Sequence, residues 1–143
     1  MSGKLLFTIA IVAVASAVVA GLLMVGGPLQ GQRDKFDDQR YEELGGLARA
    51  LLCEKYGQIP NSSLPNELTV ESLRVHCSSA GIAADDLTDN ETGQPYVYDR
   101  KNARDFSICA NFHDAKRTAR LNSHASYGAS FNPETGCVSG WLR

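Results

Sequence analysis

The sequence predicts an α+β protein in which one transmembrane helix precedes a small domain with two disulfides. Three observations lead to this fold class: a long apolar run at the start, helical periodicity after it, and alternation with a period of two further on. Helices followed by strands in chain order indicate an antiparallel sheet packed on a helix.

The apolar run extends from Leu5 to Val25 and contains no charged residue. As a helix it is about 30 Å long, which matches the hydrocarbon core of a bilayer. A cleaved signal peptide is the alternative, but its apolar region has about 7–15 residues and is shorter than this run. We therefore expect a retained single-pass anchor over residues 1–27, in contact with membrane lipid.

Small residues recur along this anchor at Ala13, Ala17, Ala20 and Gly21. Small residues allow transmembrane helices to approach closely. This face is therefore predicted to pack against another membrane-protein subunit, with simple lipid exposure as the alternative.

Residues 28–40 follow the anchor as a polar stalk or linker, and residues 41–143 are expected to form one folded α+β domain. Basic residues flank both ends of the anchor, and a count of them favours the opposite orientation. Long soluble segments, however, cross membranes largely regardless of charge. The cysteines decide the orientation instead, because disulfides form in oxidising compartments, and we expect the domain on the non-cytoplasmic side.

All four cysteines, Cys53, Cys77, Cys109 and Cys137, lie in the predicted domain. Structural zinc sites usually contain closely spaced pairs, which this chain lacks, so two disulfides are expected, with free thiols as an alternative. Three connectivities are open. The helical pattern favours Cys53–Cys77, because it places the two cysteines on neighbouring helices, and this leaves Cys109–Cys137 between two strands.

Periodicity predicts the elements of the domain. An amphipathic helix is expected over residues 41–56, followed by a short helix that has Thr69 as N-cap and ends at Gly81. Strands are expected over 95–98, 106–112 and 137–142, with a turn over 100–104, and the segment 114–120 is compatible with a helix or a loop.

An acidic loop follows the second predicted helix. Asp85, Asp86, Asp89, Asn90 and Glu91 offer the hard oxygen ligands that Ca²⁺ prefers, although their spacing is not that of an EF-hand. A solvated acidic loop is the alternative. Structural calcium is therefore the one candidate cofactor.

No catalytic motif stands out in the sequence. His113-Asp114 with His124 is a candidate for metal ligation or general-base chemistry, but the two histidines lack an evident third partner. Lys and Arg are scattered and form no basic stripe, which argues against nucleic-acid binding. We expect the chain not to be an enzyme.

Two stretches resemble the pilins and pseudopilins of type IV pili and type II secretion. Phe7-Thr8-Ile9 is similar to the start of a mature pilin, and residues 89–98 are similar to the Asp…Gly-x-Pro-Tyr-x-Tyr stretch of major pseudopilins. The order of apolar helix, amphipathic helix and sheet also resembles this family. The chain departs from it at Leu6, where a prepilin has the cleavage glycine, and at Ile11, where the family has a glutamate.

The resemblance implies a bacterial inner-membrane protein with its C-terminal domain in the periplasm. It implies a structural or interaction role, as an accessory subunit of a membrane complex or of a secretion or pilus-like assembly. A pseudopilin filament subunit is an alternative, against which the departures at residues 6 and 11 argue. A calcium- or small-ligand-binding module is a further alternative, because some pseudopilins bind calcium beside their sheet.

Overall fold

The structure is a computed structural model that describes residues 3–25, 27–53, 63–78, 80–122 and 128–142. Contacts divide the chain into two compact units, Met1–Arg33 and Asp34–Arg143. The first unit contains α1 (Gly3–Val25), whose described side chains are all exposed. Its span Gly3–Leu22 has a mean hydropathy of 2.6 and is long and apolar enough to cross a membrane.

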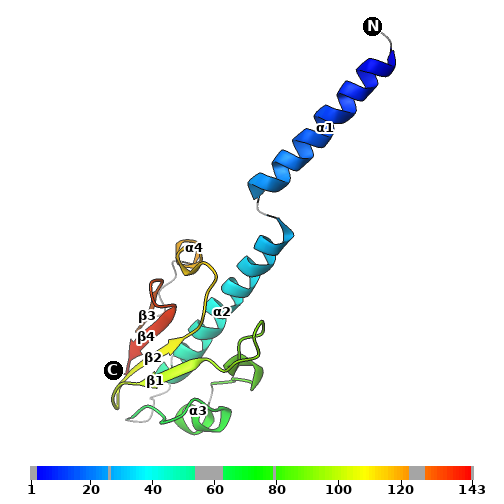
Figure 1. Cartoon of the computed structure of the whole chain (residues 1–143). Helices are drawn as coiled ribbons and strands as arrows, with labels where there is room; N and C mark the ends of the chain where they lie inside the picture. The colour runs from blue at the N-terminus through cyan, green and yellow to red at the C-terminus, as the bar shows by residue number, and fades with distance from the viewer. Residues whose placement is uncertain (1–2, 26, 54–62, 79, 123–127, 143) are drawn as a thin grey trace. The chain divides into compact units, whose positions relative to one another are not determined.

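The second unit combines helices with one antiparallel sheet (Figure 1). Its elements are α2 (Pro28–Leu52, from Asp34 on), α3 (Val70–His76), the 3-10 helix η2 (Asp85–Leu87), β1 (Val97–Arg100), β2 (Asp105–Cys109), α4 (Ala115–Leu121), β3 (Ala129–Asn132) and β4 (Cys137–Trp141). The strands lie in the order β1-β2-β4-β3, and neighbours are antiparallel. This arrangement confirms the predicted α+β class.

The core of the second unit lies between α2 and one face of the sheet. Leu44, Leu47 and Leu51 recur at helical spacing on α2 and are fully buried. They share one apolar cluster with Phe106 and Ile108 of β2. Burial of each such side chain contributes about 1.5–3 kcal/mol, so this contact is the main source of stability for the sheet–helix pair.

The buried stripe of α2 extends toward its N-terminus with charged residues. Asp37 and Arg40 continue the helical spacing of Leu44 and are 0% and 2% exposed. The segment predicted as a stalk is therefore the first half of a continuous helix. Its part from Asp34 onward belongs to the compact second unit.

The helix ends differ from the sequence prediction in detail. The described part of α2 ends at Leu52, and the predicted continuation over 54–56 lies outside the described residues. α3 begins as predicted, with Thr69 as N-cap in a reciprocal capping box with Ser72. It ends at His76 rather than at Gly81, because Cys77 adopts an extended conformation with φ −143° and joins a disulfide.

The strands also shift from the predicted positions. Phe106 and Ile108 point into the core as the alternation predicts, but β2 ends at Cys109, where the chain turns toward α4. β1 begins at Val97, because Pro95 makes only an isolated bridge with Thr88. β3 (Ala129–Asn132) has no counterpart among the predicted strands, since it is only four residues long and rich in small or polar side chains.

A close approach within the sheet makes Gly140 sensitive to substitution. A Cβ atom there would lie 2.8 Å from the carbonyl oxygen of Gly128 and 2.8 Å from Cζ of Phe106. We expect Gly140→Ala to lower the free energy of unfolding by about 1–3 kcal/mol, because a buried ring and a strand must shift. Urea unfolding measures this change.

Gly45→Ala on α2 is the matched control. A Cβ atom at Gly45 would meet only Nη1 of Arg49, at 3.9 Å, the end of a flexible side chain. Alanine favours a helix over glycine by about 1 kcal/mol, so this variant is expected to be as stable as the parent or more so. Equal destabilisation by the two substitutions would contradict the packing described for Gly140.

Candidate functional site

The predicted packing residues of the anchor share one face of α1. Ala13, Ala17, Ala20 and Gly21 lie within about 100° of one another around the helix axis. All four are exposed within the chain, and a Cβ atom at Gly21 would meet nothing within 4 Å. Such a face permits close approach of a second helix, and contact with another subunit stays a prediction.

The first disulfide, Cys53–Cys77, joins the ends of two helices. Cys53 directly follows α2 and Cys77 directly follows α3, with their Cα atoms 5.7 Å apart. The two residues are 2% and 3% exposed. Cys53 has φ +51°, a left-handed conformation that is common where a helix ends. This pair is the one that the helical pattern favours.

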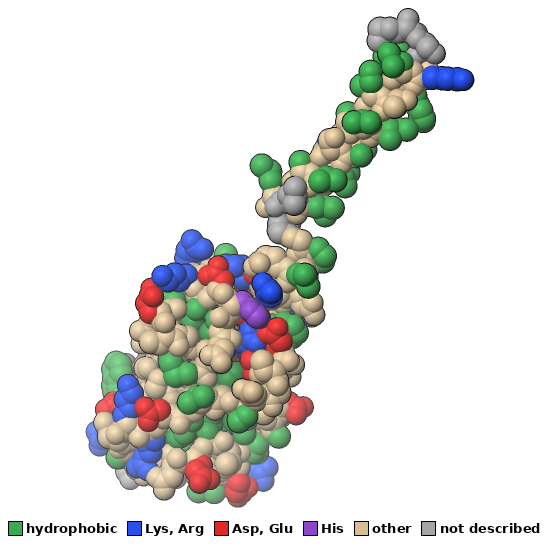
Figure 2. All heavy atoms as spheres, in the orientation of Figure 1, with side chains coloured by type: hydrophobic (Ala, Val, Ile, Leu, Met, Phe, Trp, Pro, Cys, Tyr) green, Lys and Arg blue, Asp and Glu red, His purple; other side chains and the backbone are tan. Residues whose placement is uncertain are grey.

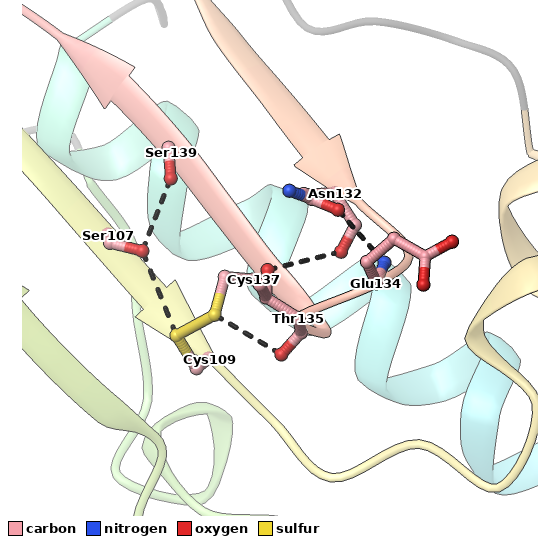
Figure 3. The surroundings of a disulfide bond; sticks show 7 residues. All are labelled: Ser107, Cys109, Asn132, Glu134, Thr135, Cys137 and Ser139. Carbon is pink, nitrogen blue, oxygen red and sulfur yellow. Dashed lines mark hydrogen bonds between the residues drawn. A yellow bond between two sulfur atoms is a disulfide. The ribbon is translucent and has the colours of Figure 1, made fainter.

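The second disulfide, Cys109–Cys137, joins β2 to β4. The two cysteines are directly opposite partners in the strand register, and their Cα atoms are 4.0 Å apart. The bond lies on the sheet face that bears Ser107 and Ser139, whose hydroxyl oxygens are 3.2 Å apart, while α2 lies behind the sheet (Figure 3). Both expected disulfides are thus present.

The acidic loop separates into two parts. Asp85 and Asp86 lie in η2, where Oδ2 of Asp86 accepts a hydrogen bond from the backbone N–H of Ala83 at 2.7 Å. Asn90 lies in the next turn and donates to Oε1 of Glu43 on α2 at 2.8 Å. These three candidate calcium ligands therefore do not converge on one point.

The other two candidate ligands, Asp89 and Glu91, converge on Arg40 of α2. Arg40 donates from Nε to Oδ2 of Asp89 at 2.7 Å and from Nη2 to Oδ1 of Asp89 at 3.2 Å. Nη2 also binds the Glu91 carboxylate, and Nη1 donates to Oδ1 of Asp37 at 2.9 Å. Arg40, Asp37 and Asp89 are 2%, 0% and 6% exposed, so the ion pairs of Arg40 with the two aspartates are buried.

Two further contacts attach this cluster to the segment between β2 and α4. The carboxylate of Asp37 accepts hydrogen bonds from the backbone N–H groups of His113, at 2.9 Å, and Asp114, at 2.7 Å. Nε2 of His113 lies 2.9 Å from Oε2 of Glu91. We call Asp37, Arg40, Asp89, Glu91 and His113 the Arg40 cluster. Its contacts join three segments of the chain: α2, the loop that contains Asp89 and Glu91, and the segment between β2 and α4.

Glu43 of α2 accepts several hydrogen bonds next to this cluster, including the one from Asn90 described above. Its carboxylate accepts hydrogen bonds from the Tyr96 hydroxyl and from Nε2 of Gln39, the latter at 3.0 Å. Burial and the hydrogen bond to Glu43 raise the pKa of Tyr96 well above its usual value. Tyr96 therefore stays a neutral donor over the physiological pH range.

The charges in the Arg40 cluster shift one another's pKa values. Burial opposes ionisation of both Arg40 and Asp89 and is the largest single influence on each. The hydrogen bonds and opposite charges around them together outweigh it, so the pKa of Arg40 is raised and that of Asp89 is lowered. Hydrogen bonds from Arg40 and His113 lower the pKa of Glu91. All three groups are consequently held in their charged forms.

These shifts predict a loss of stability in acid. Because the carboxyl groups of Asp89 and Glu91 bind protons less readily in the folded chain, the unfolded chain takes up protons first as the pH falls. Their contribution is complete above pH about 4–5 and is lost below pH about 4. Urea unfolding from pH 7 to about pH 3 is expected to show a smaller acid-induced loss for Asp89→Asn than for the parent. An equal loss in both would contradict the proposed linkage.

Within the described part of the chain, no three His, Cys, Asp or Glu side chains are arranged to hold a metal ion. Calcium binding by the acidic loop stays a prediction, and calorimetry with added calcium and with a chelator tests it through the melting temperature. His124 lies outside the described residues, so its predicted association with His113 stays untested. His76 is buried, with Nε2 2.8 Å from the Leu51 carbonyl oxygen, at the end of α2.

Sequence reasoning did not find the Arg40 cluster. The available signal was the spacing of Asp37 and Arg40, which places both charges on the apolar stripe of their helix. A buried stripe position filled by a charge requires a partner of opposite charge. The partners are far away in sequence, because Asp89 lies 49 residues and Glu91 51 residues from Arg40.

The described parts of the chain thus comprise an exposed apolar helix and a body held together by two disulfides and a buried ion cluster. Comparisons with models of protein families, with curated proteins and with solved structures give no match for this chain.

Proposed function

We propose that this chain is a single-pass membrane-anchored protein of the bacterial inner membrane, with the unit Asp34–Arg143 in the periplasm. Its role is structural, as an accessory subunit of a membrane complex or of a secretion or pilus-like assembly. The observation that carries this proposal is α1. An apolar helix exposed on all its described side chains needs a cover, and a bilayer of matching thickness supplies one.

The disulfides support the periplasmic placement. Cys53–Cys77 and Cys109–Cys137 involve all four cysteines of the chain. Disulfides persist in oxidising compartments and are rare in the cytosol. A domain of this size also gains much from such cross-links, because its hydrophobic core is small.

The polar interior of the second unit supports a structural role. Every buried side-chain nitrogen and oxygen among the described residues has a hydrogen-bond partner within the chain. The charged groups of the Arg40 cluster are likewise directed at one another. Polar groups that saturate one another stabilise a fold and are not held available for a substrate.

Membrane fractionation of cells that produce the chain tests the proposal. We expect the protein to resist alkaline carbonate extraction and to be digested when protease is added to the periplasmic side. The control is Val12→Arg with Val18→Arg, which places two charges in the apolar span at about 2.5–3.5 kcal/mol each and should release the protein from the membrane. A parent protein in the soluble fraction, or one protected from periplasmic protease, would exclude the proposal.

The alternative is a filament subunit, favoured by the similarity of Phe7-Thr8-Ile9 to the start of mature pilins. It predicts cleavage near Leu6 with N-methylation, which mass spectrometry of the purified N-terminus would show, and filaments on cells that overproduce the chain. Negative-stain electron microscopy of such cells distinguishes the alternatives, because an accessory subunit alone produces no filaments.

A further inference from the structure

The short helix α4 presents a basic and partly apolar surface. Lys116, Arg120 and Leu121 are exposed, with 66% of the Lys116 side chain and 63% of Leu121 accessible. We call these three residues the α4 basic face. Thr118 lies about 160° around the helix axis from both Lys116 and Arg120 and is fully buried, so α4 lies against the body with these two charged side chains outward.

Contacts place α4 beside the first residues of the second unit. Nε of Arg117 lies 3.2 Å from Oδ2 of Asp34, and its Nη1 lies 3.3 Å from Oδ1 of Asp38. Figure 2 shows Lys and Arg side chains at the end of this unit that carries α4, with acidic side chains beside them. Arg117 thus bridges the two carboxylates of α2 that lie nearest to α4, and Lys116 and Arg120 take no part in these two ion pairs.

Chain length limits the distance between the end of α1 and the first residue of the second unit. Asp34 follows Val25, the last residue of α1, by nine positions (34 − 25 = 9), and the chain is helical again from Pro28. Three Cα–Cα steps lead from Val25 to Pro28 and span at most about 11 Å, and the six helical steps from Pro28 to Asp34 add about 9 Å. Asp34 thus lies within about 20 Å of the end of α1 at any angle between the two units.

We propose that the α4 basic face binds the headgroups of anionic phospholipids at the surface of the membrane that holds the anchor. Lys116 and Arg120 are four positions apart on one side of α4, and Leu121 beside them is an exposed apolar side chain, as in helices that lie in a membrane interface. The ion pair of Lys116 with Glu134 at 3.0 Å is two-thirds exposed and therefore weak enough to be exchanged for a phosphate. This inference rests on the proposed function, because it requires a retained anchor.

A single tryptophan placed on the α4 basic face tests the proposal. Trp141 is the only tryptophan of the chain, so full-length protein with Leu121→Trp and Trp141→Phe carries one fluorescent reporter on α4. We compare nanodiscs of phosphatidylcholine alone with nanodiscs that also contain phosphatidylglycerol. In the anionic discs we expect a blue-shifted emission and quenching by acrylamide that is roughly twofold weaker, both reversed at about 0.5 M salt.

Two charge-matched variants decide the result. Lys116→Gln with Arg120→Gln should abolish the protection in anionic discs. Lys101→Gln with Arg104→Gln removes the same charge from the turn between β1 and β2, at the other end of β2, and should leave the protection intact. Equal quenching in the two kinds of disc, or equal effects of the two variants, would overturn the inference. Co-elution of the protein with the discs reports separately on the anchor, so the two claims fail independently.

Discussion

Replacing Arg40 with methionine is expected to lower the free energy of unfolding by about 3–5 kcal/mol. The change removes the guanidinium that Asp37 and Asp89 share, and leaves both carboxylates buried without a cation. A similar-sized apolar side chain cannot replace their hydrogen bonds. Urea unfolding of the full chain in detergent, monitored by circular dichroism, measures the decrease in the free energy of unfolding.

Arg49→Met is the matched control for this experiment. Arg49 lies on the same helix, but its side chain is exposed, so its replacement is expected to change stability by less than about 0.5 kcal/mol. If the variants at positions 40 and 49 unfold at the same urea concentration, then the Arg40 cluster does not hold the fold together.

Removing both disulfides is expected to leave the second unit unfolded at 37 °C. They link residues separated by 24 and 28 positions, and each such cross-link contributes roughly 3 kcal/mol through the entropy of the unfolded chain. The sum is comparable to the whole stability of a small domain, about 5–15 kcal/mol. Circular dichroism and thermal melting of a variant with alanine at all four cysteines check this expectation.

The two pairwise variants serve as controls for the disulfide experiment. Cys53→Ala with Cys77→Ala, and Cys109→Ala with Cys137→Ala, should each remain folded at 25 °C with a lower melting temperature. A fourfold variant that melts within a few degrees of the parent would mean that the noncovalent core alone stabilises the unit.

Much of this fold follows from local patterns in the sequence. The run Leu5–Val25, which makes up most of α1, is recognisable because it contains no charged residue over a length that can span a bilayer. Thr69 is recognisable as an N-cap because its side chain accepts a hydrogen bond from a backbone N–H three residues further on. Phe106 and Ile108 are recognisable as core residues because alternation places them on one face of the sheet. Each of these features depends only on neighbours in the chain.

The missed features depend on partners far away in sequence. β3 is short, and its pairing with β4 gives it an extended conformation that its own residues do not specify. The loop carboxylates of Asp89 and Glu91 suggested a bound cation, and the structure places the guanidinium of Arg40 between them. Their partner lies about fifty positions upstream, and no local spacing rule connects the two.

The mass of the intact protein, purified from membranes without reductant, tests the central claim most directly. A retained anchor on a periplasmic domain predicts a chain that still contains the residues of α1 and is four hydrogen atoms lighter than its fully reduced form. A chain that begins within or after α1, or one that gains no mass on reduction, would contradict the account.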